Sequence, residues 1–233
     1  MGRRSARLDE GAFVVEGPTL VDHAVASGWE LEAVFVANGN WSYQPPEAPV
    51  FELAPNVMER VASTESPQPV MAVVRRRVST LSDLSGCTFV LVGDRIGDPG
   101  NAGTMLRSAE AAGAQAVVFT AGSVDVFNPK VVRSSAGALF EVPVVVDAEL
   151  ADVLAMPGMR SYGTSSHDGM PYTDADFSGP SMIVVGNEAH GLGDDAPVSE
   201  WITIAHQGRA ESLNVAMAAT VLVFEVARQR ARG

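Results

Sequence analysis

Three polar segments of this 233-residue chain gather the side chains that could do chemistry. The first spans residues 94–103 and leads to Arg107. The second spans residues 186–191 around Glu188, and the third spans residues 207–214. Glycines, amides and helix starts in such loops can hold a small polar ligand through backbone N–H groups. An arginine fork matches phosphate geometry. The residue types alone therefore predict a site for a small polar ligand and leave its identity open.

Several familiar chemistries are excluded by the same sequence. It contains no G-x-G-x-x-G motif for dinucleotide binding, no G-x-x-x-x-G-K-[ST] phosphate-binding loop and no G-x-S-x-G nucleophile elbow of a hydrolase. His190 lies two residues from Glu188, which is not metalloprotease spacing, and the chain has only four histidines. Its one cysteine, Cys87, excludes a disulfide framework, and we expect no metal site.

The composition and net charge of the chain limit the kinds of partner that it can bind. The net charge of −12 is unlike the basic field of a non-specific polyanion binder, so any nucleic-acid contact must come from a local cluster. No signal peptide and no membrane span are expected, and a reduced, cytoplasmic setting fits the cysteine count.

Apolar runs separated by Gly and Pro predict the elements that position these loops. A small α/β unit is expected over residues 1–77, a linker over 78–86, and a second unit over 87–233. The expected elements of the first unit are strands 13–17, 33–37 and 70–74 and helices 19–27 and 55–63. Those of the second are strands 88–93, 115–120, 143–146, 160–163, 182–186 and 201–204 and helices 101–112, 128–136, 150–155 and 212–232.

Near-continuous Val and Ile strands that alternate with helices predict a parallel sheet covered on both faces. Ligands of such sheets sit beyond the carboxyl ends of the strands, where the three polar segments fall.

Together the three segments resemble the motifs of the SpoU/TrmH family of SPOUT RNA methyltransferases. Asn101-Ala-Gly-Thr-Met-Leu-Arg107 is similar to the family's N-x-G-x-x-x-R. The second match runs from Val185 to Leu192, and the third is Glu211-Ser-Leu-Asn-Val-Ala216. The resemblance spans nearly the whole chain, and three motifs in the matching order are far more specific than any one of them.

The resemblance implies an N-terminal substrate-binding domain, a parallel-sheet α/β domain with a deep trefoil knot, and a homodimer. It implies transfer of a methyl group from S-adenosylmethionine to a ribose 2′-hydroxyl of structured RNA, with ribosomal RNA first and transfer RNA second. The implied catalytic residues are Asn101, Arg107, Glu188, Ser212 and Asn214. The implied cofactor residues are Gly163, Thr164, Gly186, Asn187, Gly191, Ile204 and Leu213. Arg133 and Arg209 are the expected RNA contacts.

The family proposal makes Arg107 a base, but a guanidinium does not readily give up its proton. We expect Arg107 to bind the adjacent phosphate and stabilise the forming alkoxide. One departure stands out: the family's third motif begins Ile-Pro-Met, whereas this chain has Ile204-Ala-His206.

Other interpretations stay open. A catalytically silent RNA-binding or assembly factor could share the fold, and a related knotted enzyme could methylate a base or a protein. Asn101, Ser212 and Asn214 could be no more than helix caps. The run from Arg75 to Arg77 could be a solvated linker or an RNA contact.

Overall fold

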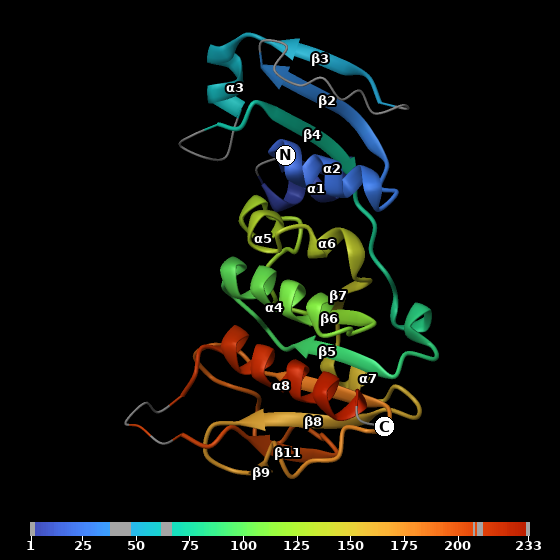
Figure 1. The fold of residues 1–233 in the computed structure, drawn as a ribbon, viewed down its shortest axis with the longest axis vertical. Coiled ribbons are helices and arrows are strands. Elements are labelled where there is room, and N and C mark those ends of the chain that lie inside the picture. Colours follow the sequence, from blue (N-terminus) through green and yellow to red (C-terminus); the bar gives the residue numbers. More distant parts are fainter. Residues whose placement is uncertain (1–2, 38–47, 62–66, 207, 209–211, 232–233) are drawn as a thin grey trace.

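The computed structural model describes residues 3–37, 48–61, 67–206, 208 and 212–231, the side chain of Pro55 excepted. Arg209, expected to contact RNA, lies outside the described residues. Two sheets lie at different levels along the long axis, with helices between them (Figure 1).

The small sheet has the strand order β1-β4-β2-β3. It is mixed, because β4 runs antiparallel to β1 and β2 whereas β2 and β3 are parallel. Its elements are α1 (Arg4–Glu10), β1 (Ala12–Glu16), α2 (Pro18–Ala26), β2 (Leu31–Ala37), β3 (Val50–Leu53), α3 (Pro55–Val61) and β4 (Val70–Arg75). The sequence did not predict α1 or β3.

The large sheet has seven parallel strands in the order β7-β6-β5-β10-β8-β11-β9, which confirms the predicted parallel α/β class. Its first elements are η1 (Leu81–Leu84), β5 (Phe89–Gly93), α4 (Pro99–Ala111), β6 (Ala116–Thr120), α5 (Pro129–Ser134), α6 (Ala138–Glu141) and β7 (Val144–Ala148). These are followed by α7 (Leu150–Leu154), β8 (Arg160–Ser165), β9 (Met170–Pro171), β10 (Ser181–Val185), β11 (Glu200–Thr203) and α8 (Val215–Arg230).

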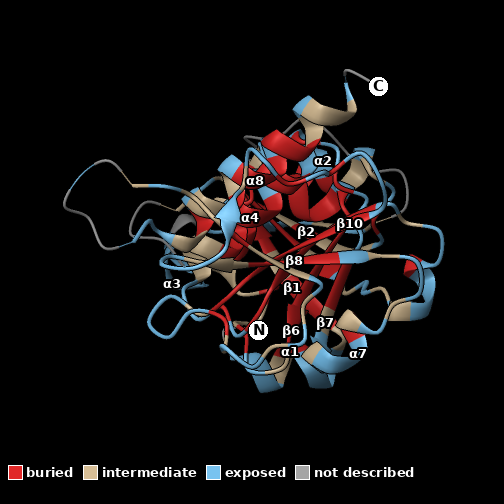
Figure 2. Cartoon of the chain, turned by 90° about the horizontal axis from the view of Figure 1, so that it is seen from below, coloured by how far each residue is buried: buried red, intermediate tan, exposed pale blue. Residues whose placement is uncertain are grey.

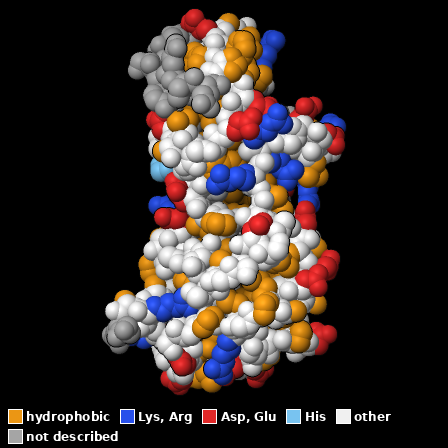
Figure 3. All heavy atoms as spheres, turned by 90° about the vertical axis from the view of Figure 1, so that its right-hand side faces the viewer, with side chains coloured by type: hydrophobic (Ala, Val, Ile, Leu, Met, Phe, Trp, Pro, Cys, Tyr) orange, Lys and Arg blue, Asp and Glu red, His pale blue; other side chains and the backbone are white. Residues whose placement is uncertain are grey.

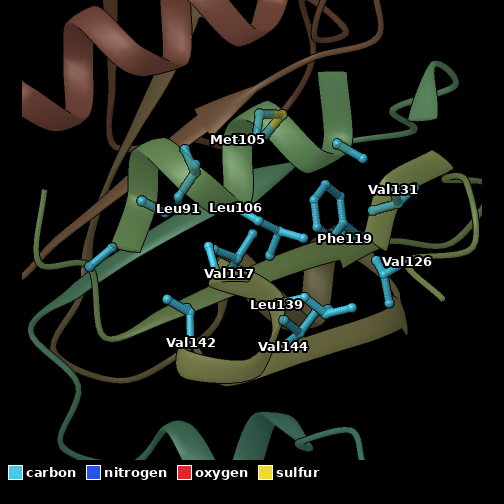
Figure 4. Close-up of a cluster of buried hydrophobic side chains, with 14 of the residues drawn as sticks. Leu91, Met105, Leu106, Val117, Phe119, Val126, Val131, Leu139, Val142 and Val144 are labelled. Atoms are coloured by element: carbon cyan, nitrogen blue, oxygen red, sulfur yellow. The ribbon is translucent and has the colours of Figure 1, made fainter. Parts of the chain in front are cut away.

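Two apolar clusters cover the faces of this sheet, as the uninterrupted Val and Ile strands predict. On one face Leu106 of α4 and Leu222 of α8 belong to the same buried cluster as Leu91 of β5. Figure 4 shows side chains of α4, among them Met105 and Leu106, beside Val117 and Phe119 of β6. The other face buries the ends of η1 and α7. In Figure 2 the strands form the buried centre of the molecule.

The two sheets do not have separate cores. Phe13 of β1 packs against Phe127 with ring centroids 4.7 Å apart, and the Trp29 ring lies 5.4 Å from that of Phe140. The indole N–H of Trp29 donates to the Phe140 carbonyl at 2.9 Å. Nearby, Arg7 forms an ion pair of 2.7 Å with Asp125, and both side chains are at least 90% buried. One continuous apolar cluster therefore crosses from the small sheet to the large one.

The three consecutive arginines lie at this junction. Arg75 pairs with Glu32 at 2.8 Å, the Arg76 guanidinium lies over the Phe127 ring, and that of Arg77 lies over the Trp29 ring. A guanidinium over an aromatic ring is worth about 0.5–1 kcal/mol at exposed sites. Arg76 thus helps to join the two units, whereas the contacts of Arg75 and Arg77 lie within the first one. Neither interpretation of the sequence included this role.

No helix among the described residues is long and apolar enough to cross a bilayer.

Candidate active site

The three polar segments meet at the carboxyl ends of the large-sheet strands. The loop after β5 leads into α4, the loop after β10 covers residues 186–192, and the segment after β11 leads into α8. This is the edge at which parallel sheets bind ligands.

Glu188 connects the first two segments. Its Oε2 accepts the Gly97 N–H at 3.0 Å, and its Oε1 accepts the Asp98 N–H at 2.9 Å. The Nδ2 of Asn101 also donates to Glu188 Oε1, at 3.0 Å. Partial burial acts to raise the pKa of Glu188, but these three hydrogen bonds outweigh it and hold the pKa below its usual value. Glu188 therefore stays a carboxylate that ties the β10 loop to the start of α4.

Asn214 adds the third segment to the same network. Its Nδ2 donates to Asn101 Oδ1 at 3.0 Å, while its own Oδ1 accepts the N–H groups of Ala216 and Met217 as the N-cap of α8. Because Asn214 caps the helix, α8 begins at Val215 rather than at the predicted residue 212.

Asn101 is not the cap of its helix. Asp98 caps α4, since its carboxylate accepts the Asn101 N–H at 2.9 Å. Lys130 lies 3.5 Å from the same carboxylate. The Asn101 side chain is thus free to bridge Glu188 and Asn214, a connection that a cap alone would not make.

A pocket of about 400 Å³ opens beside this network, within the size range of small-ligand sites. Thr164, Gly186, Asn187, Gly191, Ile204 and Leu213 of the expected cofactor set line it, and so does Ser212. Gly163 does not line it: this residue lies in β8, where an added Cβ would come within 3.0 Å of Val198 and Leu192.

The β10 loop needs glycine at two points. A Cβ on Gly186 would lie 2.0 Å from the backbone nitrogen of Leu192, so no larger residue fits without moving the backbone. Gly191 has φ +65° and closes the turn through two backbone hydrogen bonds with Asn187. These two positions shape the wall of the pocket.

One face of α8 forms part of the wall through Val215, Ala218 and Leu222. These residues were not predicted from the sequence, although their spacing of three and four is the signal of a shared helix face. Trp201 and His206 line the same pocket and were not predicted to do so either.

Arg107 and Arg133 lie away from the pocket lining. Arg107 is exposed on α4 and makes no hydrogen bond or ion pair with the part of the chain that the structure describes. Arg133 is half-buried near the end of α5. The arrangement thus combines a pocket, a network of amides around a carboxylate, and an arginine available to a phosphate. Nowhere in the described ranges do His, Cys, Asp or Glu side chains gather in a group that could hold a metal.

Comparison with known proteins gives a family match for each unit. Residues 88–224 match the model of the SpoU rRNA Methylase family, and residues 1–72 match that of the MRM3-like substrate binding domain. The chain is 35% identical over 231 residues to the Bacillus subtilis 23S rRNA (guanosine(2553)-2′-O)-methyltransferase RlmP, covering 96% of this chain and 91% of the relative. It is 31% identical to the 23S rRNA (uridine(2479)-2′-O)-methyltransferase of Streptomyces viridochromogenes, covering 100% of this chain and 88% of that protein.

Solved structures agree with these matches. The SpoU methyltransferase AviRb from Streptomyces viridochromogenes, in complex with the cofactor AdoMet, superposes with a TM-score of 0.90 at 30% identity, covering 100% of this chain and 95% of that one. An AdoMet-bound rRNA methyltransferase from Sinorhizobium meliloti gives a TM-score of 0.87 at 26% identity, covering 97% and 91% of the two chains.

Proposed function

The chain belongs to the SpoU rRNA methylase family, and from this membership we propose that it transfers a methyl group from S-adenosylmethionine to a ribose 2′-hydroxyl of ribosomal RNA. One observation carries the proposal for the site. Three segments far apart in the chain meet through Glu188, Asn101 and Asn214 beside a pocket of cofactor size.

The pocket suits S-adenosylmethionine. The backbone packs so closely at Gly186 that any side chain would displace the β10 loop that lines the pocket, and the wall combines polar loops with the apolar face of α8. S-adenosylmethionine supplies a methyl group that its sulfonium already activates. The residues proposed to hold it are Thr164, Gly186, Asn187, Gly191, Ile204 and Leu213; Gly163 would support them from β8. The loops that follow β8, β10 and β11 line the pocket, and the trefoil knot implied by the resemblance is part of the proposal for this region.

Arg107 would hold the RNA. A guanidinium keeps its proton at any working pH, so Arg107 acts as a fixed positive charge rather than a base. Placed at the phosphate next to the target ribose, it lowers the pKa of the 2′-hydroxyl by about 1–3 units and stabilises the forming alkoxide. No hydrogen bond joins Arg107 to the described part of the Glu188 network, so that network fixes the loops while Arg107 binds substrate. Ser212, exposed in the pocket lining, completes the proposed set beside Asn214.

The substrate proposed is 23S ribosomal RNA, because two relatives that cover most of this chain carry that substrate in their names. Those relatives modify different nucleotides, so the position in the RNA must be found by experiment. We expect residues 1–77 to recognise the RNA, with residues 78–86 as linker and Arg133 as a phosphate contact, and the enzyme to work in the cytoplasm. The face that carries the linker mixes acidic and basic side chains (Figure 3).

The decisive test maps 2′-O-methyl groups in ribosomal and transfer RNA from cells with and without the gene. One ribosomal position that loses its methyl group in the deletion supports the proposal, and an unchanged ribosomal map contradicts it. Loss of a transfer-RNA methyl group instead would support the second substrate class.

Purified variants test the role of Arg107. Arg107→Ala should lower the rate of methyl transfer to the mapped RNA at least 100-fold. Its affinity for S-adenosylmethionine should stay the same, since Arg107 lies outside the pocket lining. Arg107→Lys, which keeps the charge but not the fork, should lose less. Normal turnover by Arg107→Ala would contradict the assignment. A wild-type protein that binds RNA but not S-adenosylmethionine in calorimetry would favour the alternative, a silent RNA-binding or assembly factor.

We also propose a homodimer packed through α8. Met217, Val221 and Phe224 follow one another on one face of this helix at spacings of four and three, and they are 63%, 37% and 46% exposed. A single helix that leaves three large apolar side chains in water is typical of an interface. Light scattering at micromolar concentration should give twice the chain mass, and Phe224→Lys should give the monomer mass; a wild-type monomer would contradict the proposal.

A further inference from the structure

Arg95 belongs to the first polar segment, and the proposed function gives it no role. It lies just after β5, at the carboxyl edge of the large sheet, and its φ is +52°. Residues with a side chain rarely adopt such a backbone conformation, whereas glycine adopts it readily. Non-glycine residues that are held in this way gather at functional sites. An arginine at this position therefore needs an explanation.

Three contacts hold Arg95 in place. Its backbone N–H donates to the Thr120 hydroxyl oxygen at 2.9 Å, and its carbonyl accepts a side-chain N–H of Asn187 at 2.8 Å. Its Nε donates at 2.9 Å to the carboxylate of Asp94, a residue that is 3% exposed. The Arg95 side chain itself is 53% exposed, and no hydrogen bond joins its Nη atoms to the described part of the chain. Arg95 thus carries a positioned positive charge whose outer donors are available to a ligand.

The charge of Arg95 lies between the cofactor pocket and the first unit. In the sheet β5 has β10 on one side and β6 on the other, and neighbouring strands are about 4.8 Å apart. On the β10 side, Asn187 lines the pocket. On the β6 side, the Cγ of Arg95 lies beside Gly122, in the turn after β6. One strand further, Asp147 of β7 pairs with Arg4 of α1, in the unit that matches a substrate binding domain. An RNA strand that follows this edge from the first unit to the pocket passes Arg95.

We propose that the Nη atoms of Arg95 bind a backbone phosphate of the RNA, on the side of the target nucleotide that leads to the first unit. Parallel N–H groups of a guanidinium match phosphate oxygens, and a chain with a net charge of −12 must bind RNA through local cations. Arg95 then holds the strand at a second point, apart from Arg107. The inference rests on the proposed function, because it takes RNA as the substrate.

Filter binding of the full-length protein to an unmethylated 23S ribosomal RNA transcript, at several salt concentrations, tests this proposal. Arg95→Gln keeps a side-chain donor for Asp94 but not the charge. It should lower the affinity about tenfold, because a charge-assisted hydrogen bond is lost. It should also reduce the slope of log Kd against log salt concentration by about 0.7–0.9, the effect of one phosphate contact. Arg95→Lys keeps the charge and should keep the slope.

Arg160→Ala is the matched control. The Arg160 side chain is 51% exposed and also pairs with one carboxylate, that of Glu200, but it lies at the amino end of β8, on the opposite edge of the sheet. This variant should bind the transcript as the wild type does. The affinity of each variant for S-adenosylmethionine and its melting temperature check that the pocket and the fold are intact.

The outcomes separate the proposal for Arg95 from the function on which it rests. If the wild-type protein does not bind the transcript, the proposed substrate is wrong, and the proposal for Arg95 is wrong with it. If the wild type binds and Arg95→Gln binds equally well with the same slope, the proposal for Arg95 is wrong and the substrate stands. A weaker affinity with an unchanged slope would also overturn the proposal, because Arg95 would then act on the shape of the loop through Asp94 and not on a phosphate.

Discussion

Replacing Glu188 by alanine tests whether one carboxylate holds the motif segments together. The change removes three hydrogen bonds of 2.9–3.0 Å, from the backbone of Gly97 and Asp98 and from the Asn101 side chain, and a longer one of 3.4 Å from the Asn187 side chain. It leaves the Asn214 cap of α8 intact, so the effect reports on the contact between the β10 loop and α4.

The loss in the free energy of unfolding caused by Glu188→Ala can be estimated from these contacts. A typical hydrogen bond contributes about 0.5–1.5 kcal/mol net. Glu188 and its two backbone donors are exposed, so water replaces part of what is lost and the low end of that range applies. The three shorter bonds then give about 1–2 kcal/mol, which lowers the melting temperature of a chain of this size by about 2–8 °C. Because a misplaced loop also misplaces the pocket, methyl transfer should fall by about 100-fold.

Thermal and denaturant unfolding measure the loss of stability. A double-mutant cycle with Asn101→Ala shows how much of that loss comes from the hydrogen bond between Asn101 and Glu188. Both single variants break the same bond, so the double variant should be less destabilised than the sum by about 0.5–1 kcal/mol. Glu110→Ala, on the exposed side of α4, is the matched control and should change stability by less than about 0.5 kcal/mol. If Glu188→Ala unfolds like the wild-type protein and the cycle is additive, the network does not hold the loops.

Three further outcomes are expected. Gly186→Ala should weaken S-adenosylmethionine binding at least tenfold in calorimetry, because its Cβ would meet backbone at 2.0 Å, whereas Gly179→Ala, with open space at its Cβ, should bind normally. Asp125→Ala should lower the free energy of unfolding by about 3–5 kcal/mol, since it removes one partner of a buried ion pair; a loss below 1 kcal/mol would show that the pair does not hold the two units together. The pKa of Glu188 is lower in the folded chain, so its stabilisation is fully present above the usual value of 4.5 and is lost as the pH falls through the folded-state pKa. The difference in the free energy of unfolding between wild type and Glu188→Gln should therefore become smaller as the pH is lowered. A difference that becomes larger would contradict the proposed role of the Glu188 carboxylate.

Much of the fold could be predicted from local pattern. The parallel strands β5, β6 and β10 were found because both of their faces are buried and their sequences are continuously apolar. By contrast, α1, β3 and the two-residue strand β9 were missed. The short strand Val50–Leu53 has two exposed positions and carries no apolar alternation, and α1 is a seven-residue helix without a side-chain cap.

The pocket was predicted in part. Loop residues such as Gly186 and Leu213 carried a motif signal, and they line it. Val215, Ala218 and Leu222 were missed because α8 is apolar on most sides, and only its packing shows which face meets the pocket and which is left exposed. His206 was seen as a departure, but its burial and its unpaired nitrogen are properties of the folded loop.

The sequence by itself determined the class of fold, the order of the elements and the motif residues, because hydrophobic period, glycine placement and capping are local properties of the chain. Only the tertiary structure decided that Asn101 bridges Glu188, 87 positions away, and Asn214, 113 positions away. It alone placed Arg76 and Arg77 on the aromatic rings that join the two sheets. Such contacts depend on where distant segments meet, and that is set by how two sheets and their helices close around one apolar core.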